Sequence, residues 1–184
     1  MPMKVIQAPL SGVLVIEPDV FTDDRGFFLE TFSVRRYAEA GIDLTFTQDN
    51  WSRSVRNTLR GLHFQEPNPQ GKLIMATRGR IWDVAVDIRR GSANFGKWFA
   101  EELSDANRRQ LWVPPGFAHG FCVLSDLADV VYKCTAPYTP QSDRCLAWND
   151  PELAISWPVS EPLLSPKDAA APLLSAAPLL PVLG

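Results

Sequence analysis

Short apolar segments recur along most of the chain, and they are rich in β-branched and aromatic residues. Residues that favour turns separate them, for example at 23–26, 90–92, 104–105 and 115–116. This pattern is typical of short antiparallel strands joined by hairpins and loops. Strands are predicted at 13–18, 26–32, 44–51, 58–65, 72–88, 97–103, 110–114, 118–124 and 129–136.

Few segments favour helices. Residues 33–40 predict one helix, with Ser33 in the N-cap position and Gly41 directly after its end. A second, weaker helical stretch follows Ser165. Many strands and few helices predict an all-β protein, built as a jelly-roll barrel or sandwich with a few short helices. The 184 residues contain no repeat and no linker, so 1–184 is expected to form a single domain.

Composition narrows the classes of function. The formal net charge of −3 argues against general nucleic-acid or membrane-surface binding, although it allows a local basic pocket. The three cysteines form no C-x-x-C pair, and the N-terminal residues make a poor signal peptide. A reduced, cytoplasmic protein is therefore expected. The uncharged run 169–184 is interrupted by prolines and is too short to span a membrane, so it predicts a tail that lies along the surface or is loosely ordered.

His63 lies between Leu62 and Phe64 in a predicted strand, where a polar ring needs a hydrogen-bond partner or a chemical role. A catalytic metal is not expected, since an H-x-H pair is missing and only His119 remains elsewhere. Thiol catalysis is disfavoured because His119 and Cys122 point to opposite faces of a strand. The chain also has no glycine motif for dinucleotides or phosphates, so no cofactor is expected.

Acid–base chemistry remains. A carboxylate beside His63 could tune this residue as a base near neutral pH, and Lys72 could stabilise an oxygen that becomes anionic. Tyr132 shares a strand face with Val130 and Cys134, so its hydroxyl could enter the barrel and donate a proton. The alternative is that His63 and Tyr132 are ordinary core residues with satisfied hydrogen bonds.

Other polar residues on these strands favour a ligand pocket. Gln48 and Asn50 lie on one face of a strand, which is unusual for a core. Arg60 and His63 are three residues apart, so a bulge at Gly61 or a position of Arg60 at the strand mouth is needed to bring them together. The arginines that could bind a diphosphate are Arg25, Arg53, Arg56 and Arg60, of which Arg53 and Arg56 fit equally well as solvated surface.

Several long blocks carry a family resemblance. They are DDRGFFLETF, QDNWSRSVRNTLRGLHFQ, QGKLIMATRGRIWDVAVDIRRGS, WVPPGFAHGF and WNDPELAISWP. In this order and spacing they closely resemble the dTDP-4-dehydrorhamnose 3,5-epimerase family, from about residue 15 to residue 174. The P-x-G-x-x-H pattern at 114–119 also resembles the second cupin motif, while the H-x-H of the first motif is missing, as fits this metal-free family.

The resemblance implies a cupin-type jelly roll without a cofactor, usually a homodimer in which the N-terminal strand reaches into the partner. It implies a dTDP-sugar substrate, dTDP-4-dehydro-6-deoxy-D-glucose, which is epimerised at C3 and C5 on the way to dTDP-L-rhamnose. His63 then corresponds to the base and Asp168 to the carboxylate that orients it. Lys72 corresponds to the lysine facing the O4 enolate, and Tyr132 to the proton donor on the opposite face of the sugar.

The resemblance also implies contacts with the nucleotide and the sugar. The residues at these positions are Arg25, Glu30, Gln48, Asn50, Arg60, His119, Tyr138, Asp143 and Lys167. Asp143 stands where a glutamate is expected, so its side chain is shorter than the family pattern predicts.

Three alternatives stay open at this point. The first is a dTDP-4-keto-sugar epimerase that acts at C3 or C5 alone in another deoxysugar pathway, which Tyr132 disfavours. The second is a non-catalytic sugar-nucleotide-binding cupin, which would be expected to lack His63 or Asp168. The third is a metal-dependent cupin oxygenase, which the missing histidine pair disfavours. The double epimerase is the interpretation that the matched residues favour.

Overall fold

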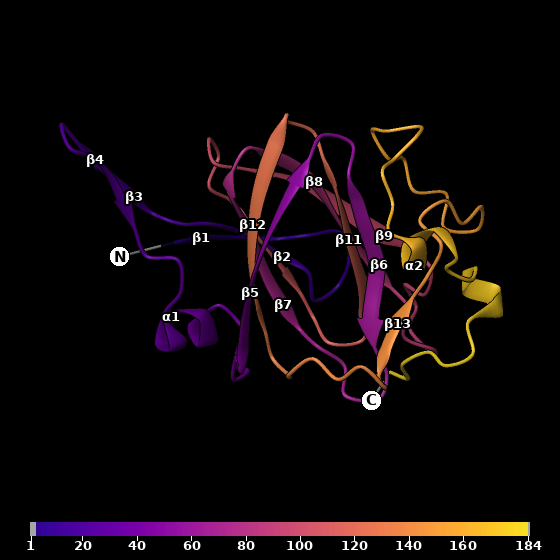
Figure 1. Ribbon diagram of the computed structural model, residues 1–184. Helices are drawn as coiled ribbons and strands as arrows, with labels where there is room; N and C mark the ends of the chain where they lie inside the picture. Colours follow the sequence, from indigo (N-terminus) through magenta and orange to yellow (C-terminus); the bar gives the residue numbers. More distant parts are fainter. Residues whose placement is uncertain (1–2, 184) are drawn as a thin grey trace.

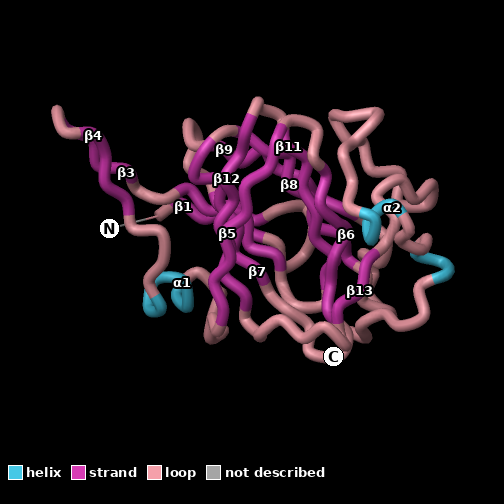
Figure 2. The backbone as a smooth tube through the Cα atoms, in the orientation of Figure 1, coloured by secondary structure: helices cyan, strands magenta, loops and turns pink. Residues whose placement is uncertain are grey.

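Two antiparallel sheets face each other in the computed structural model, which describes residues 3–183, and helices lie only at their margins (Figures 1 and 2). Within these residues the larger sheet has six strands, in the spatial order β1 (Lys4–Gln7), β2 (Leu14–Glu17), β10 (Gln110–Val113), β7 (Lys72–Arg78), β12 (Leu127–Cys134) and β5 (Gln48–Val55). The second sheet has five, in the order β13 (Asp143–Cys145), β6 (Leu59–Gln65), β11 (Phe117–Val123), β8 (Arg80–Asp87) and β9 (Trp98–Ser104). The predicted all-β class is confirmed.

The main core lies between the two sheets and follows from the alternation of side chains along each strand. Around β2, Val13 and Val15 are buried in this core, together with Ile74 of β7 and Phe121 of β11. The intervening residues of β2 point to the other face of the larger sheet, where they pack against helix α1 (Val34–Glu39) and its flanking loops. Both faces of β2 are therefore covered, which explains its uninterrupted apolar sequence.

The C-terminal segment covers the outer face of the smaller sheet, and Figure 1 shows it beside β6, on the side opposite the N-terminal elements. It contains helix α2 (Pro166–Ala169) and a short 3₁₀ helix (Leu174–Ala176). Leu174 and Leu180 are buried against Phe64 and Val84. The predicted surface tail is thus an ordered segment that contributes side chains to a second core.

Some predicted strand boundaries are wrong. The segment 72–88 forms two strands, β7 and β8, which lie in different sheets. They separate at Gly79, whose φ is +72° and whose added Cβ would lie 2.1 Å from the Leu127 carbonyl oxygen, so only glycine fits this turn. Strand β5 begins at Gln48 rather than at residue 44, and the sequence pattern missed β1, β13 and β3 (Val20–Asp23).

The strands β3 and β4 (Gly26–Leu29) form a separate hairpin that projects from the body of the molecule (Figures 1 and 2). Its turn lies at the predicted residues 23–26. Phe27 and Phe28 on this hairpin are 59% and 69% exposed. The chain then returns to the body through α1, which has the predicted bounds, although the Ser33 side chain makes no capping hydrogen bond.

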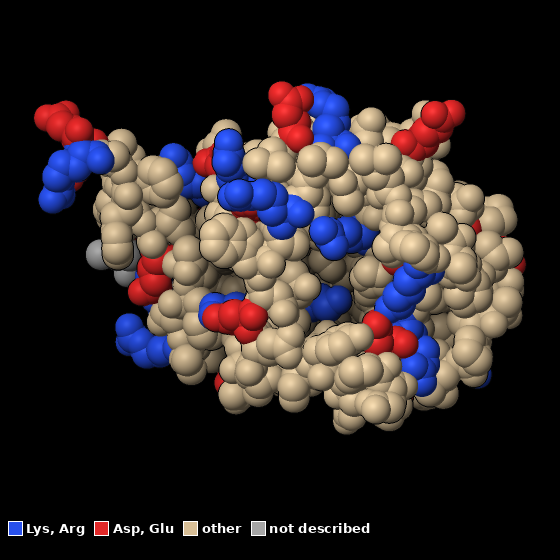
Figure 3. Space-filling model, in the orientation of Figure 1, with Lys and Arg blue, Asp and Glu red and all other residues tan. Residues whose placement is uncertain are grey.

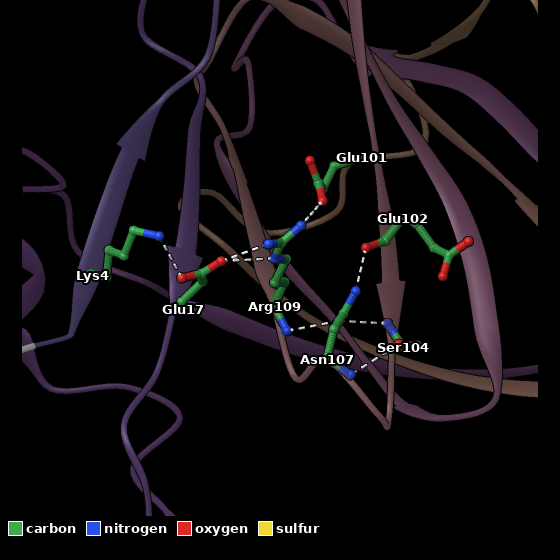
Figure 4. A network of polar contacts seen from close by, with 7 residues as sticks. All are labelled: Lys4, Glu17, Glu101, Glu102, Ser104, Asn107 and Arg109. Atoms are coloured by element: carbon green, nitrogen blue, oxygen red, sulfur yellow. Dashed lines mark hydrogen bonds and ion pairs between the residues drawn. The ribbon is translucent and has the colours of Figure 1, made fainter.

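A polar network links the edge of the larger sheet to β9 of the smaller one (Figure 4). Arg109 donates hydrogen bonds to Glu17 of β2 and to Glu101 of β9, and Lys4 of β1 pairs with Glu17. In the adjoining turn, Asn107 donates to the Glu102 carbonyl oxygen. These pairs of Arg109 are partly buried and lie near the surface, where ion pairs contribute little free energy individually. None of the helices in the described part of the chain has the length and apolarity of a membrane span.

Candidate active site

A cavity of about 280 Å³ lies where β5, β7 and β12 of the larger sheet face β6 and β13 of the smaller one. Figure 3 shows a hollow near the centre of one face of the molecule, with a basic group at its base. Most of the predicted site residues line this cavity, namely Gln48, Asn50, His63, Lys72, Tyr132, Tyr138, Asp143 and Lys167. The structure therefore brings together residues that are more than 100 positions apart in the sequence.

His63 and Asp168 form a hydrogen-bonded pair at one wall of the cavity. The Nε2 atom of His63 lies 2.5 Å from Oδ1 of Asp168, and the two side chains are 33% and 3% exposed, respectively. Burial alone would raise the pKa of Asp168, but the hydrogen bonds from His63, Ser165 and the Gly61 amide hold this pKa below its ordinary value. Because Nε2 bonds to the carboxylate, Nδ1 is the ring nitrogen left for a ligand.

A bulge in β6 gives His63 its orientation. His119 of β11 is opposite His63, and Phe121 of β11 is opposite Arg60, so β6 contains one residue more than β11 over the same length. Gly61 lies in this bulge and has a φ of +126°. A Cβ at this position would lie 2.6 Å from Cα of Gly120. Of the two possibilities that the spacing of Arg60 and His63 left open, the structure has the bulge at Gly61. Arg60 donates a hydrogen bond to Ser54 of the opposite sheet.

Lys72 and Tyr132 lie on the opposite wall, on the neighbouring strands β7 and β12. Lys72 is only 8% exposed, and burial lowers the pKa of its ammonium group. Burial raises the pKa of the Tyr132 hydroxyl, which keeps it protonated at neutral pH. Tyr132 also packs against the main core beside Val130, so its side chain points toward the interior, which the strand pattern had allowed.

Polar side chains connect the rim of the cavity. Gln48 donates a hydrogen bond to Asn50, as expected for two residues on one strand face, and accepts one from the amide of Tyr138. The Asp143 carboxylate accepts hydrogen bonds from the Tyr138 hydroxyl at 3.1 Å and from the Lys167 ammonium at 2.5 Å. The rim therefore offers an aromatic ring and a positive charge close to the His63–Asp168 pair.

Comparisons with known proteins agree with this geometry. The sequence profile described as dTDP-4-dehydrorhamnose 3,5-epimerase matches residues 7–176. The chain belongs to this epimerase family. A dTDP-4-dehydrorhamnose 3,5-epimerase of Pseudomonas aeruginosa is 54% identical over 168 residues, which cover 90% of this chain and 93% of that protein. A dTDP-4-dehydrorhamnose 3-epimerase of Streptomyces niveus is 42% identical, covering 95% of this chain and 86% of that protein.

A solved structure of the family is similar over the full length of the chain. The dTDP-6-deoxy-D-glucose-3,5-epimerase of Legionella pneumophila Philadelphia 1, in complex with dTDP-4-keto-L-rhamnose, has 50% sequence identity and a TM-score of 0.97. The similarity covers 100% of both chains. The strand topology described above is thus the fold of a family member crystallised with a dTDP-sugar.

His119 has a buried position in this member of the epimerase family. Its Nε2 atom lies 2.9 Å and 3.0 Å from the two carboxylate oxygens of Asp83, and both side chains are buried between the sheets. Burial lowers the pKa of His119, and the Asp83 carboxylate only partly opposes this effect. Sequence analysis did not single out Asp83, although a carboxylate in the apolar strand RIWDVAVD was a usable signal, because buried acids are nearly always paired.

Five predicted site residues of this epimerase-family chain do not line the cavity: Asp168, which bonds to His63 behind its wall, Arg60, which bonds to Ser54, the buried His119, and Arg25 and Glu30. Arg25 is at the tip of the projecting hairpin, where it pairs with Asp23, and Glu30 pairs with Arg36. The predicted arginine cluster is therefore divided, and Arg53 and Arg56 form ion pairs with Asp129 and Asp126 at the surface, respectively.

Sequence analysis also missed Ser52 of β5. Its hydroxyl is buried without a hydrogen-bond partner among the described residues. Ser52 lies between Asn50 and Ser54 on the strand face that points toward the opposite sheet.

Proposed function

We propose that this protein converts dTDP-4-dehydro-6-deoxy-D-glucose to dTDP-4-dehydro-L-rhamnose by inverting C3 and C5, the isomerase step of dTDP-L-rhamnose biosynthesis. The observation that carries the proposal is the His63–Asp168 pair, which faces a cavity whose opposite wall carries Lys72 and Tyr132. Relatives named for this reaction share about half of the sequence over nearly the whole chain.

His63 is the proposed base. The C4 ketone of the sugar acidifies the hydrogens on C3 and C5, so an imidazole can remove them without help from a redox group. The bond between Nε2 and Asp168 keeps the proton on Nε2, which leaves Nδ1 to accept the carbon-bound proton. The same carboxylate stabilises the imidazolium that forms, in the way that an aspartate supports histidine in other acid–base sites.

Lys72 is proposed to stabilise the enolate. Proton removal moves negative charge onto O4 of the sugar. The Lys72 ammonium is already in place in a wall of the cavity that holds little water, so it interacts with that charge more strongly than solvent would. The lowered pKa of Lys72 strengthens this group as a hydrogen-bond donor. Its near-complete burial also fixes the position of the charge before the substrate binds.

Tyr132 is proposed to return a proton to the opposite face of the sugar. Inversion requires a donor on the side away from the base, because a single base would restore the original configuration. Tyr132 and His63 are on facing sheets, and the raised pKa of the tyrosine keeps its hydroxyl protonated and ready to donate. The donor is restored when the imidazolium of His63 and the tyrosinate exchange protons with solvent after each inversion.

The polar rim is proposed to bind the rest of the substrate. Tyr138 and Lys167 line the cavity and offer a ring for stacking on the nucleotide base and a positive charge for the diphosphate. Arg60, which bonds to Ser54, offers a second positive charge. Further contacts with the nucleotide and sugar are assigned to Gln48, Asn50 and Asp143, which line the cavity, and to His119, the strand partner of His63. We also place the protein in the cytoplasm, where its free cysteines stay reduced.

We further propose a homodimer in which the projecting hairpin reaches the cavity of the partner. The hairpin exposes Phe27 and Phe28, and Trp51 on the outer face of the larger sheet is 70% exposed. Such apolar surface is typical of protein–protein contacts. In this arrangement Arg25 and Glu30, which lie outside the cavity of their own chain, bind the substrate held by the partner subunit.

Subunit mixing tests the dimer. Arg25→Ala and His63→Ala homodimers are each expected to be nearly inactive, since every site lacks one residue. The mixture made by co-expression is expected to regain about a quarter of wild-type activity, because half of its dimers are heterodimers and each heterodimer has one intact site of two. If Arg25 serves its own chain, no intact site forms and no activity returns. A monomeric mass by sedimentation would also contradict the proposal.

Solvent exchange tests the reaction itself. The purified protein is incubated with dTDP-4-dehydro-6-deoxy-D-glucose in D₂O, and NMR follows the hydrogens on C3 and C5. Deuterium at both carbons, and a rhamnose product after reduction, are expected. Deuterium at C3 alone would identify a 3-epimerase instead. Binding of the nucleotide sugar without exchange at either carbon would contradict an enzymatic role.

A further inference from the structure

The Asp168 carboxylate has a second fixed contact besides His63. Oδ1 of Asp168 lies 2.5 Å from the histidine, while Oδ2 accepts a hydrogen bond from the Ser165 hydroxyl at 2.9 Å. The same hydroxyl oxygen accepts a hydrogen bond from the Asp168 amide at 3.1 Å. Ser165 therefore holds both the backbone and the side chain of the residue that orients the proposed base.

The local sequence explains this arrangement. Ser165 has an extended backbone conformation and caps α2, and Pro166 occupies the first helical position, where its missing N–H loses no hydrogen bond. Asp168 is the third helical residue, so its amide points at the cap hydroxyl. Because α2 is only four residues long, this cap supplies a large share of its internal hydrogen bonds.

We infer that Ser165 is a positioning residue for proton abstraction: its hydroxyl fixes the plane of the Asp168 carboxylate and thereby the direction of the His63 ring. The inference rests on the proposed function. Oδ1 is bonded to His63 on β6, and Oδ2 is bonded to Ser165 at the start of α2. The carboxylate therefore cannot rotate about its Cβ–Cγ bond without breaking one of these contacts. Without the hydroxyl, only the histidine and the Gly61 amide would hold it.

The contact also affects the charge of the pair. Asp168 is 3% exposed, so solvent solvates its carboxylate poorly and hydrogen bonds take over this task. A hydroxyl donated to the carboxylate favours its ionised form and lowers the proton affinity of the coupled His63–Asp168 pair. Removal of the hydroxyl should therefore raise the apparent pKa of the pair and shift the acid limb of the pH–rate profile to higher pH.

Three variants and the wild-type protein test the inference. Ser165→Ala removes the hydroxyl, Ser165→Thr keeps it, and Ser92→Ala removes a similar serine–carboxylate bond, to Asp87, on a loop outside the site. Each is assayed by deuterium exchange at C3 and C5 over a range of pH, with thermal unfolding as a check of the fold. Ser165 is itself exposed, so the alanine variant is expected to fold.

The expected result is a loss of about tenfold in kcat for Ser165→Ala, with KM nearly unchanged and the acid limb moved to higher pH. Ser165→Thr and Ser92→Ala should keep the wild-type kcat and pH profile. A Ser165→Ala protein with wild-type kinetics, or one with reduced kcat but an unmoved acid limb, would overturn the positioning role. Failure of the wild-type protein to exchange either carbon would instead contradict the proposed function.

Discussion

The molecule contains two histidine–aspartate pairs, and they differ in where the ring lies. In both pairs Nε2 of the histidine bonds to the carboxylate. The His63 side chain is 33% exposed and lines the cavity, whereas the His119 side chain is 8% exposed and lies between the sheets. The same two residue types thus form one pair with an open side and one pair that is enclosed.

The two pairs also differ in how the chain brings them together. His119 and Asp83 are 36 residues apart, on the neighbouring strands β11 and β8, so the sheet itself fixes their distance. His63 and Asp168 are 105 residues apart, and the carboxylate arrives on the C-terminal helix α2. The enclosed pair belongs to the rigid centre of a sheet, and the open pair depends on a peripheral segment.

This difference shows why paired histidines need not share a role. A base must exchange a proton with a bound molecule, which requires a free ring nitrogen on the side of the cavity. Burial instead disfavours the charged imidazolium, and it lowers the pKa of His119. The geometry therefore favours His63 as the base and His119 as a neutral hydrogen-bonding group on the neighbouring strand.

Alanine substitution at the two histidines should separate these roles most strongly. His63→Ala is expected to slow exchange at C3 and C5 by at least ~10²–10⁴-fold, because the proposed general base is lost. The free energy of unfolding should change little, since Asp168 keeps its bonds to Ser165 and Gly61. Deuterium exchange and urea unfolding measure the two effects on the same preparation.

His119→Ala is expected to give the opposite result. It leaves the Asp83 carboxylate buried without its partner, and breaking a buried pair in this way costs about 3–5 kcal/mol of unfolding free energy. The folded fraction should lose at least about tenfold less activity than His63→Ala does. A stable His119→Ala protein as inactive as His63→Ala would reverse the assignment of the base.

The sequence could predict the open pair only in part. The alternation of residues identified most strands, and it placed Gln48, Asn50 and Tyr132 on faces that line the cavity. The spacing of Arg60 and His63 also suggested, as one of two possibilities, the bulge that the structure has at Gly61. No local pattern, however, links Asp168 to a histidine 105 residues earlier, and only the family resemblance suggested it.

Other features were beyond local patterns for a physical reason. Asp83 finds its partner through sheet pairing, which depends on strand order rather than on neighbouring residues. The break of 72–88 at Gly79 depends on the close approach of the Leu127 carbonyl, which comes from a distant strand. The position of Arg25 on a projecting hairpin likewise follows from tertiary structure, since its flanking sequence reads as an ordinary turn.

A smaller effect, the pH dependence of stability, should distinguish the enclosed pair without abolishing activity. Burial lowers the pKa of His119, although Asp83 opposes the shift and Lys72 and His63 reinforce it. Below about pH 6.5 the unfolded chain therefore binds a proton at His119 that the folded protein does not. The free energy of unfolding should therefore fall as the pH drops below about 6.5, by at most ~1.4 kcal/mol per pH unit, and the loss ends below the folded pKa of His119.

Asp168, the carboxylate of the open pair, affects stability in a different pH range. The pKa of Asp168 is lowered in the folded protein, so its contribution to stability is complete above about pH 4 and is lost only as the pH falls through the folded value.

His119→Asn keeps a donor for Asp83 but cannot titrate. Urea unfolding of this variant should therefore show a free energy of unfolding that changes less between pH 7 and 5.5 than that of the wild type. His63→Asn, measured in parallel, gives the contribution of His63 to the pH dependence of the free energy of unfolding. An unchanged slope in His119→Asn would mean that His119 binds protons equally in the folded and unfolded states, and the enclosed pair would then not be held neutral by burial.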